Sequence, residues 1–198
     1  GYMVIIGSRT LEKAEAAVAD LREVMAERGV SEVTVQAMSN LDAAAAAEII
    51  TLTVPFSHQV STLESVRAQL QGKILIDVTV PLVPPRVARV QLPKEGSAGQ
   101  IAQELLGEEV RVVSAFQNVA AAHLQEGKGV ECDVLVSGNK KEAREQVISL
   151  VEAAGMRGFH AGMINNAAAA EALTSVLISI NKQYGCHAGI KISGLGDA

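Results

Sequence analysis

Ser8, Arg9 and Thr10 carry hydroxyl or cationic groups and follow a short apolar run at residues 3–6, after a single glycine. Such a run is typical of a buried strand, and glycine lets the chain turn tightly at its end. Open α/β sheets bind ligands at the carboxyl ends of their strands. Because Lys13 stands one helical turn further on, hydroxyl, guanidinium and ammonium groups can converge there on a dianion.

The dianion that this group fits is the 2′-phosphate of NADP. Enzymes that use NAD carry an acidic residue at the end of the second strand, which holds the ribose 2′-hydroxyl. Here Ser-Arg-Thr stands in place of that acid. The alternative is an ordinary strand-to-helix turn, in which Thr10 caps the next helix and Arg9 pairs with Glu12. Taken by itself, the stretch leaves both interpretations open.

The composition indicates one α/β domain with a sizeable core. The 198 residues are 48% apolar but only 3% aromatic, a balance common where helices cover a parallel sheet. The net charge of −5 argues against sequence-independent binding of nucleic acid, and no apolar run is long enough to span a membrane. Cys132 and Cys186 are too few for a disulfide framework. We expect reduced thiols in a cytoplasmic protein, with Cys132 buried.

The elements that must position the candidate residues alternate along the chain. We predict helices over residues 11–28, 41–46, 58–70, 98–106, 140–154 and 165–184, with Asn40, Ser57 and Ser97 as caps. Strands are predicted at residues 3–6, 33–35, 49–53, 74–76, 110–113, 134–136 and 158–160, and a long proline-containing loop at 78–96. This alternation favours a doubly wound, mostly parallel sheet. The last helix is apolar on more than one face, which favours a buried position in a subunit interface.

Four loops follow predicted strands, at residues 7–10, 54–58, 79–82 and 114–118. In a doubly wound sheet they share one edge. Their small, neutral residues suit two planar cofactors packed face to face, since hydride transfer needs close stacking and little acid–base help from the protein. The alternative is that they are only connections. A metal site is not expected, because the histidines (His58, His123, His160 and His187) have no paired spacing.

An ordered series of short motifs resembles the NADP-dependent oxidoreductases of the deazaflavin coenzyme F420. The series covers nearly the whole chain, at residues 4–13, 51–58, 77–82, 96–98, 113–116, 132–138, 161–162, 171–174 and 180–191. The resemblance implies a Rossmann-like fold with a small C-terminal helical part and assembly as a homodimer. It also implies reversible hydride transfer between NADP(H) and the deazaflavin ring. Since a ring carbon takes the hydride directly, no catalytic acid or base is expected.

The resemblance also implies a division of the site. Residues 1–138 would form the NADP-binding domain, and residues 139–198 would contribute to the deazaflavin site and the dimer interface. The residues expected to hold the 2′-phosphate are Ser8, Arg9 and Lys13, with Thr10 between them. Those expected along the NADP path are Val54, Pro55 and His58, with Ala121 near the nicotinamide. Those expected around the deazaflavin are Thr79, Pro81, Leu82, Ser97, Ala98 and Gln117.

The sequence departs from the family pattern in two places. The family's first strand and glycine-rich turn, which cradles the pyrophosphate, have no counterpart, so we expect the sequence to be a fragment. Gln117, Asn118 and Ala120 stand where family members often have histidine or proline. Two other functions stay open: an NADP-dependent reductase of a small imine or keto acid, which needs a proton donor near the carbonyl, and a non-catalytic NADP-binding regulator.

Overall fold

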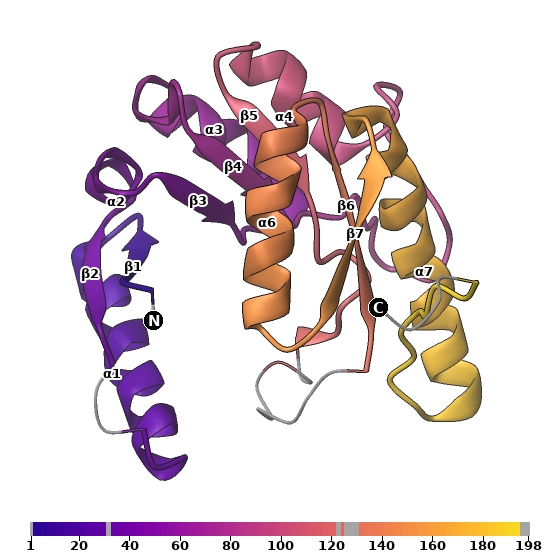
Figure 1. The fold of residues 1–198 in the computed structure, drawn as a ribbon, viewed down its shortest axis with the longest axis horizontal. Helices are drawn as coiled ribbons and strands as arrows, with labels where there is room; N and C mark the ends of the chain where they lie inside the picture. Colours follow the sequence, from indigo (N-terminus) through magenta and orange to yellow (C-terminus); the bar gives the residue numbers. More distant parts are fainter. Residues whose placement is uncertain (1, 31–32, 122–123, 125–130, 195–198) are drawn as a thin grey trace.

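The computed structural model describes residues 2–30, 33–121, 124 and 131–194, and strands alternate with helices along them (Figure 1). The strands are β1 (Val4–Ser8), β2 (Val35–Ser39), β3 (Ile49–Leu52), β4 (Ile74–Asp77), β5 (Arg111–Ser114), β6 (Asp133–Gly138) and β7 (Arg157–Gly162). The helices are α1 (Leu11–Glu27), α2 (Asn40–Ala46), α3 (Gln59–Val66), α4 (Ala98–Leu106), α6 (Lys141–Ala153) and α7 (Ala167–Tyr184). Short 3-10 helices are η1 (Phe56–His58), η2 (Arg67–Leu70) and η3 (Ile164–Asn166).

The strands form two sheets. β1 and β2 pair in parallel, and a five-stranded sheet has the order β3-β4-β5-β6-β7. All neighbours in the larger sheet are parallel except β5 and β6, which are antiparallel. The predicted α/β class with mostly parallel strands is therefore confirmed, but one continuous sheet is not seen in the described part of the chain. The helix α2 contacts β1 and β2 on one side and α3 and η2 on the other, so it connects the two parts.

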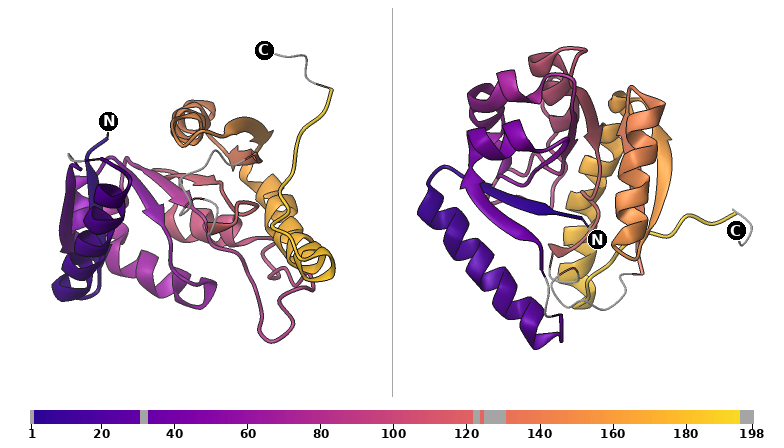
Figure 2. Two further views of the ribbon diagram at one scale, coloured as in Figure 1. Left: turned by 90° about the horizontal axis from the view of Figure 1, so that it is seen from below. Right: turned by 60° about the vertical axis from the view of Figure 1, so that its left-hand side comes forward.

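The larger sheet is buried on both faces because its strands are apolar at consecutive positions. In β4, Leu75 packs into a cluster with α3 and α4, while Ile74 and Ile76 pack into a second cluster with α6. Successive strand side chains point to opposite faces, so a continuous apolar run serves both layers. Figure 2 shows the resulting three layers, with α6 on one face of the sheet and α3 and α4 on the other.

Several predicted boundaries are corrected by the structure. The second strand is Val35–Ser39 rather than residues 33–35, because it is these residues that pair with β1. Ser39, not Asn40, caps α2 by accepting the Asp42 amide at 3.1 Å. Ser57 does not cap α3, since it lies inside η1 and His58 precedes the helix.

Other expectations are confirmed. Ser97 caps α4 by accepting the Gln100 amide at 3.0 Å. The segment from 78 to 96 contains no strand or helix. Cys132 is buried, as expected.

The other cysteine, Cys186, is exposed. Within the described ranges, no helix combines the length and hydropathy needed to cross a bilayer.

Candidate functional site

The predicted phosphate-binding group lies at the end of β1 and the start of α1. Ser8 is the last residue of β1 and is half-buried, whereas Arg9 and Lys13 are exposed. Thr10 stands at the N-cap of α1, but its side chain makes no capping hydrogen bond. No ion pair to Arg9 or Lys13 occurs among the residues that the structure describes. Both cations are therefore accessible to an anion, and the group fits a 2′-phosphate.

The loops that follow β3, β4 and β5 meet through a buried hydrogen-bond network centred on Gln59. Its Nε2 donates to Asp77 Oδ2 at 2.5 Å, to Thr79 Oγ1 at 3.2 Å and to the Ala98 carbonyl at 2.8 Å. Asp77 also accepts the Thr79 amide, at 2.8 Å. The network joins the first residue of α3, the end of β4 and the first residue of α4.

Gln117 extends the network to the loop after β5. Its Nε2 donates to the Asp77 carbonyl and to Ser114 Oγ, both at 2.8 Å. The preceding residue, Phe116, has a φ of 72°, a left-handed conformation that is uncommon for a bulky side chain. The turn thereby directs the Gln117 side chain back toward the end of β4. Asn118 then donates to the Asp133 carbonyl at 2.7 Å, so the same edge reaches β6.

The predicted cofactor residues on this edge form two layers. The first layer is at least partly accessible: Val54, Pro55, His58, Leu82 and Ala121. The second layer is buried: Thr79, Pro81, Ser97, Ala98 and Gln117. Buried residues of the second layer can shape a ligand site from beneath, whereas only the first layer offers side chains to a ligand in this conformation.

The N-terminus of α4 is occupied by a carboxylate from α7. Glu171 accepts the Ala98 amide at 2.7 Å and the Gly99 amide at 3.0 Å, and it is 1% exposed. These amides have no partner inside the helix, and a negative charge there is favoured by the helix dipole. Any ligand contact of Ala98 must therefore use atoms other than its amide.

Burial controls the protonation of both network carboxyls. Burial raises the pKa of Asp77, although hydrogen bonds from Thr79 and Gln59 oppose the change. Burial also raises the pKa of Glu171 to about 7, and the Asp77 charge adds to this while the Gly99 and Ala98 amides oppose it. Ionisation of Asp77 therefore makes ionisation of Glu171 less favourable.

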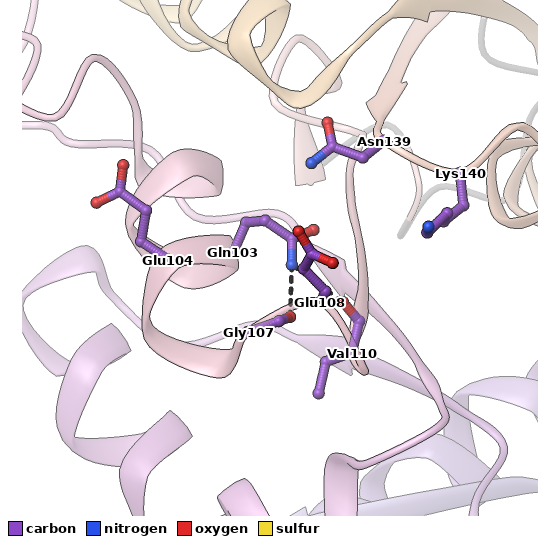
Figure 3. A pocket seen from close by; sticks show the side chains of 7 residues that line it. All are labelled: Gln103, Glu104, Gly107, Glu108, Val110, Asn139 and Lys140. Carbon is purple, nitrogen blue, oxygen red and sulfur yellow. Dashed lines mark hydrogen bonds between the residues drawn. The ribbon is translucent and has the colours of Figure 1, made fainter.

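Two cavities lie beside this edge or opposite it. The first, of about 350 Å³, is shown in Figure 3; the Gln103 side chain beside it donates to the Gly107 carbonyl at 2.8 Å. Its lining residues are Gln103, Glu104, Gly107, Glu108, Val110, Asn139 and Lys140. Because β6 is antiparallel to β5, these residues lie where β5 begins, away from the predicted cofactor edge.

The second cavity, of about 510 Å³, lies where β6 and β7 begin. It is lined by Glu131, Cys132, Asp133, Gly155, Met156, Arg157 and Lys191. Its cations are already engaged: Arg157 pairs with Asp133 and Lys191 with Glu131, each at 2.8 Å. Arg157 and Ile192 donate hydrogen bonds to Asp133, and the Arg157 bond is the main cause that lowers the pKa of Asp133.

The structure thus gathers most of the predicted residues into two groups. Ser8, Arg9, Thr10 and Lys13 belong to the β1–β2 part, while the other predicted residues belong to the larger sheet and its connections. The histidines form no metal site in the described ranges, and His123 lies outside them.

The sequence interpretation gave no role to Gln59, Asp77, Glu171 or Thr174. One signal was present: an acidic residue in the middle of an apolar helix requires a partner when it is buried.

Comparisons with known proteins give one consistent result. A family model described as "NADP oxidoreductase coenzyme F420-dependent" matches residues 1–81. The chain is 36% identical to the F420-dependent NADP reductase of Methanocaldococcus jannaschii, over 97% of this chain and 88% of that protein. It is 38% identical to the F420-dependent NADP reductase of Methanothermobacter thermautotrophicus, over 98% of this chain and 86% of that protein.

A solved structure supports the fold. It comes from Arthrobacter sp. FB24, and the activity suggested for that protein is F420-dependent NADP reduction. The TM-score is 0.76 with 25% sequence identity, covering 94% of this chain and 86% of that one.

Proposed function

The chain belongs to the family of F420-dependent NADP reductases, and from this premise we propose that it transfers a hydride reversibly between NADP(H) and the deazaflavin ring of coenzyme F420. The observation that carries the proposal is the 36% identity that extends over 97% of the chain. The chain is accordingly an oxidoreductase, with NADP(H) and coenzyme F420 as its small-molecule substrates.

The site supports transfer without an acid or base from the protein. Asp77 and Glu171 are buried, and their oxygens accept hydrogen bonds from protein groups. When bound, the two cofactors supply the hydride donor and acceptor. The protein's part is to hold the two rings together and to exclude water.

We assign the contacts of each cofactor as part of the proposal. Ser8, Arg9 and Lys13, with Thr10, hold the 2′-phosphate. The exposure of Arg9 and Lys13, and the lack of an ion pair to either within the described residues, support this assignment. The NADP path uses the accessible Val54, Pro55, His58 and Ala121. The deazaflavin lies against Leu82, above the buried layer formed by Thr79, Pro81, Ser97, Ala98 and Gln117.

The division of labour along the chain is proposed in the same way. Residues 1–138 bind NADP, and residues 139–198 contribute to the deazaflavin site and to a homodimer interface. Exposed apolar side chains support the interface: Val176 is 45% exposed and Tyr184 76% exposed on α7. Light scattering on the purified protein tests it, and a monomeric mass at micromolar concentration would contradict it. Two free thiols support a cytoplasmic location.

The activity is tested by mixing the protein with NADPH and oxidised coenzyme F420. Hydride transfer should remove the visible absorbance of the deazaflavin, and NADH in place of NADPH is the control for the 2′-phosphate. Absence of turnover with NADPH, in protein shown to be folded by circular dichroism, would contradict the proposal.

A further inference from the structure

The carboxylate of Glu171 has partners from a segment far away in the sequence. It accepts both first amides of α4 from its place on α7, and the side chain is 1% exposed. Among the residues that the structure describes, Asp77 is the ionisable group whose charge acts on this carboxyl. A buried carboxylate without hydrogen-bond donors would destabilise the fold. The two hydrogen bonds to Glu171 therefore fix α4 and α7 relative to each other.

The constraint passes from α4 to the ends of the strands. Ala98 donates its amide to Glu171 and accepts Gln59 Nε2 at its carbonyl, at 2.8 Å. Gln59 in turn donates to Asp77 and Thr79. A displacement of the α4 N-terminus therefore displaces the loop that follows β4.

Two further α7 side chains hold other loops. Thr174 Oγ1 donates to the Gln117 carbonyl at 2.8 Å, in the loop after β5. Ser175 Oγ donates to the Arg89 carbonyl at 3.3 Å, in the long segment between β4 and α4. The three residues lie within about one turn of the helix, so one short stretch of α7 fastens three separate segments of the candidate site.

We infer that Glu171 and Thr174 are positioning residues that shape the deazaflavin side of the site from α7. They act through the loops that they hold, because Glu171 accepts the Ala98 amide and Thr174 donates to the Gln117 carbonyl. Arg9 follows β1 and Lys13 lies on α1, next to the smaller sheet, so this stretch of α7 does not hold the residues proposed for the 2′-phosphate. The inference rests on the proposed function, since it assigns the coenzyme F420 side to these loops.

The test compares binding of the two cofactors. In Glu171→Gln the side-chain NH2 group faces a backbone N–H, so one hydrogen bond is lost. We expect the Kd for oxidised coenzyme F420, measured by its fluorescence, to rise about tenfold. The Kd for NADPH should stay within about twofold of wild type. Equal weakening of both cofactors, or no change in either, would overturn the inference.

A pair of variants at Thr174 covers the case in which Glu171→Gln does not fold. Thr174→Val keeps the shape of the side chain and removes the donor to Gln117, whereas Thr174→Ser keeps the hydroxyl. We expect about threefold weaker binding of oxidised coenzyme F420 in the valine variant and binding near wild type in the serine variant. Identical affinities in the two variants would refute the role of this contact. Glu152→Gln, an exposed charge removal on α6, is the control.

Amide hydrogen exchange separates this inference from the proposed function. Without any cofactor, the amides of Ala98 and Gly99 should exchange at least about tenfold faster in Glu171→Gln than in wild type. Unchanged exchange would mean that Glu171 does not hold α4. A wild-type protein that shows this protection but no hydride transfer would contradict the proposed function alone.

Discussion

The free energy of unfolding should depend on pH through Glu171. Its pKa is raised from an ordinary value of 4.5 to about 7 by burial. Between these values the folded protein binds more protons than the unfolded chain, so stability falls as the pH rises. Below pH 4.5 the carboxyl is neutral in both the folded and the unfolded state, so it does not change the free energy of unfolding. Above pH 7 it is ionised in both states, and the full cost of burying its charge lowers that free energy. Glu171→Gln removes this dependence, because glutamine does not titrate.

The size of the effect follows from the pKa difference. One pKa unit is equivalent to about 1.4 kcal/mol, so a change from 4.5 to about 7 corresponds to about 3 kcal/mol. The charge of Asp77 is one of the causes of the raised Glu171 pKa, so this figure already contains the repulsion between the two carboxyls.

Urea unfolding of wild type and Glu171→Gln at about pH 5, 6, 7 and 8 measures the difference. We expect wild type to lose about 2.5 kcal/mol relative to the variant across this range, because a small part of the cost is already present at pH 5. A constant offset between the two proteins, or a wild type that gains relative stability as the pH rises, would refute the reasoning. Glu152→Gln should follow the wild-type curve, because this glutamate is exposed.

Three further predictions concern other parts of the molecule. Arg9→Ala should weaken NADPH binding by about ten- to a hundredfold, or about 1.5–3 kcal/mol, and NADH binding much less; similar losses in a fluorescence titration would mean that Arg9 does not contact the phosphate. Gly138→Ala should lower the urea midpoint by the equivalent of about 1–3 kcal/mol, because the added Cβ would lie 2.8 Å from the Val112 carbonyl oxygen; an unchanged midpoint would contradict this. Arg157→Ala should cost about 1 kcal/mol at pH 7, a small value because Arg157 is 59% exposed. The part of this cost that comes from the ion pair should disappear as the pH falls through the lowered pKa of Asp133, and a cost independent of pH would contradict the assignment.

The parts of the fold that follow from local pattern were predictable from the sequence. The run Ile74-Leu75-Ile76 is apolar at every position, which indicates a strand covered on both faces, and β4 has helices on both faces. Ser97 precedes a helix-forming segment and is its cap. In each case the deciding interactions lie within a few residues, so a short window of sequence contains them.

The boundary of β2 depends on interactions that no short window contains. Residues 33–35 have the β-branched composition of a strand, and the Thr34 carbonyl does accept the Val4 amide at 3.0 Å. The strand itself runs from Val35 to Ser39, because pairing with β1 decides its extent. The polar residues of that range, Gln36 and Ser39, are not of the types that favour a strand, so the sequence pattern did not include them.

The buried contacts that hold the loops of the candidate site were not predictable from the sequence, for a related reason. The partners of Glu171 are backbone amides, which every residue possesses, so no residue type marks Ala98 and Gly99 as their source. The accessible residues, such as Arg9 and His58, were identified because their side chains carry the chemistry themselves. Predicting which residues lie beneath them requires the packing of α4 against α7.

The contacts of α7 also set the order in which the protein can mature during its synthesis. Glu171 and Ala98 are 73 residues apart, Thr174 and Gln117 are 57 apart, and Ser175 and Arg89 are 86 apart. Such separations make these contacts slow to form, since long loops of chain must close first. The ribosome makes α7 after every segment that it fastens, and domains acquire structure as they emerge. A nascent chain can therefore complete its five-stranded sheet while the start of α4 and the loop after β5 are still unsecured, and these segments are held in place only when α7 docks.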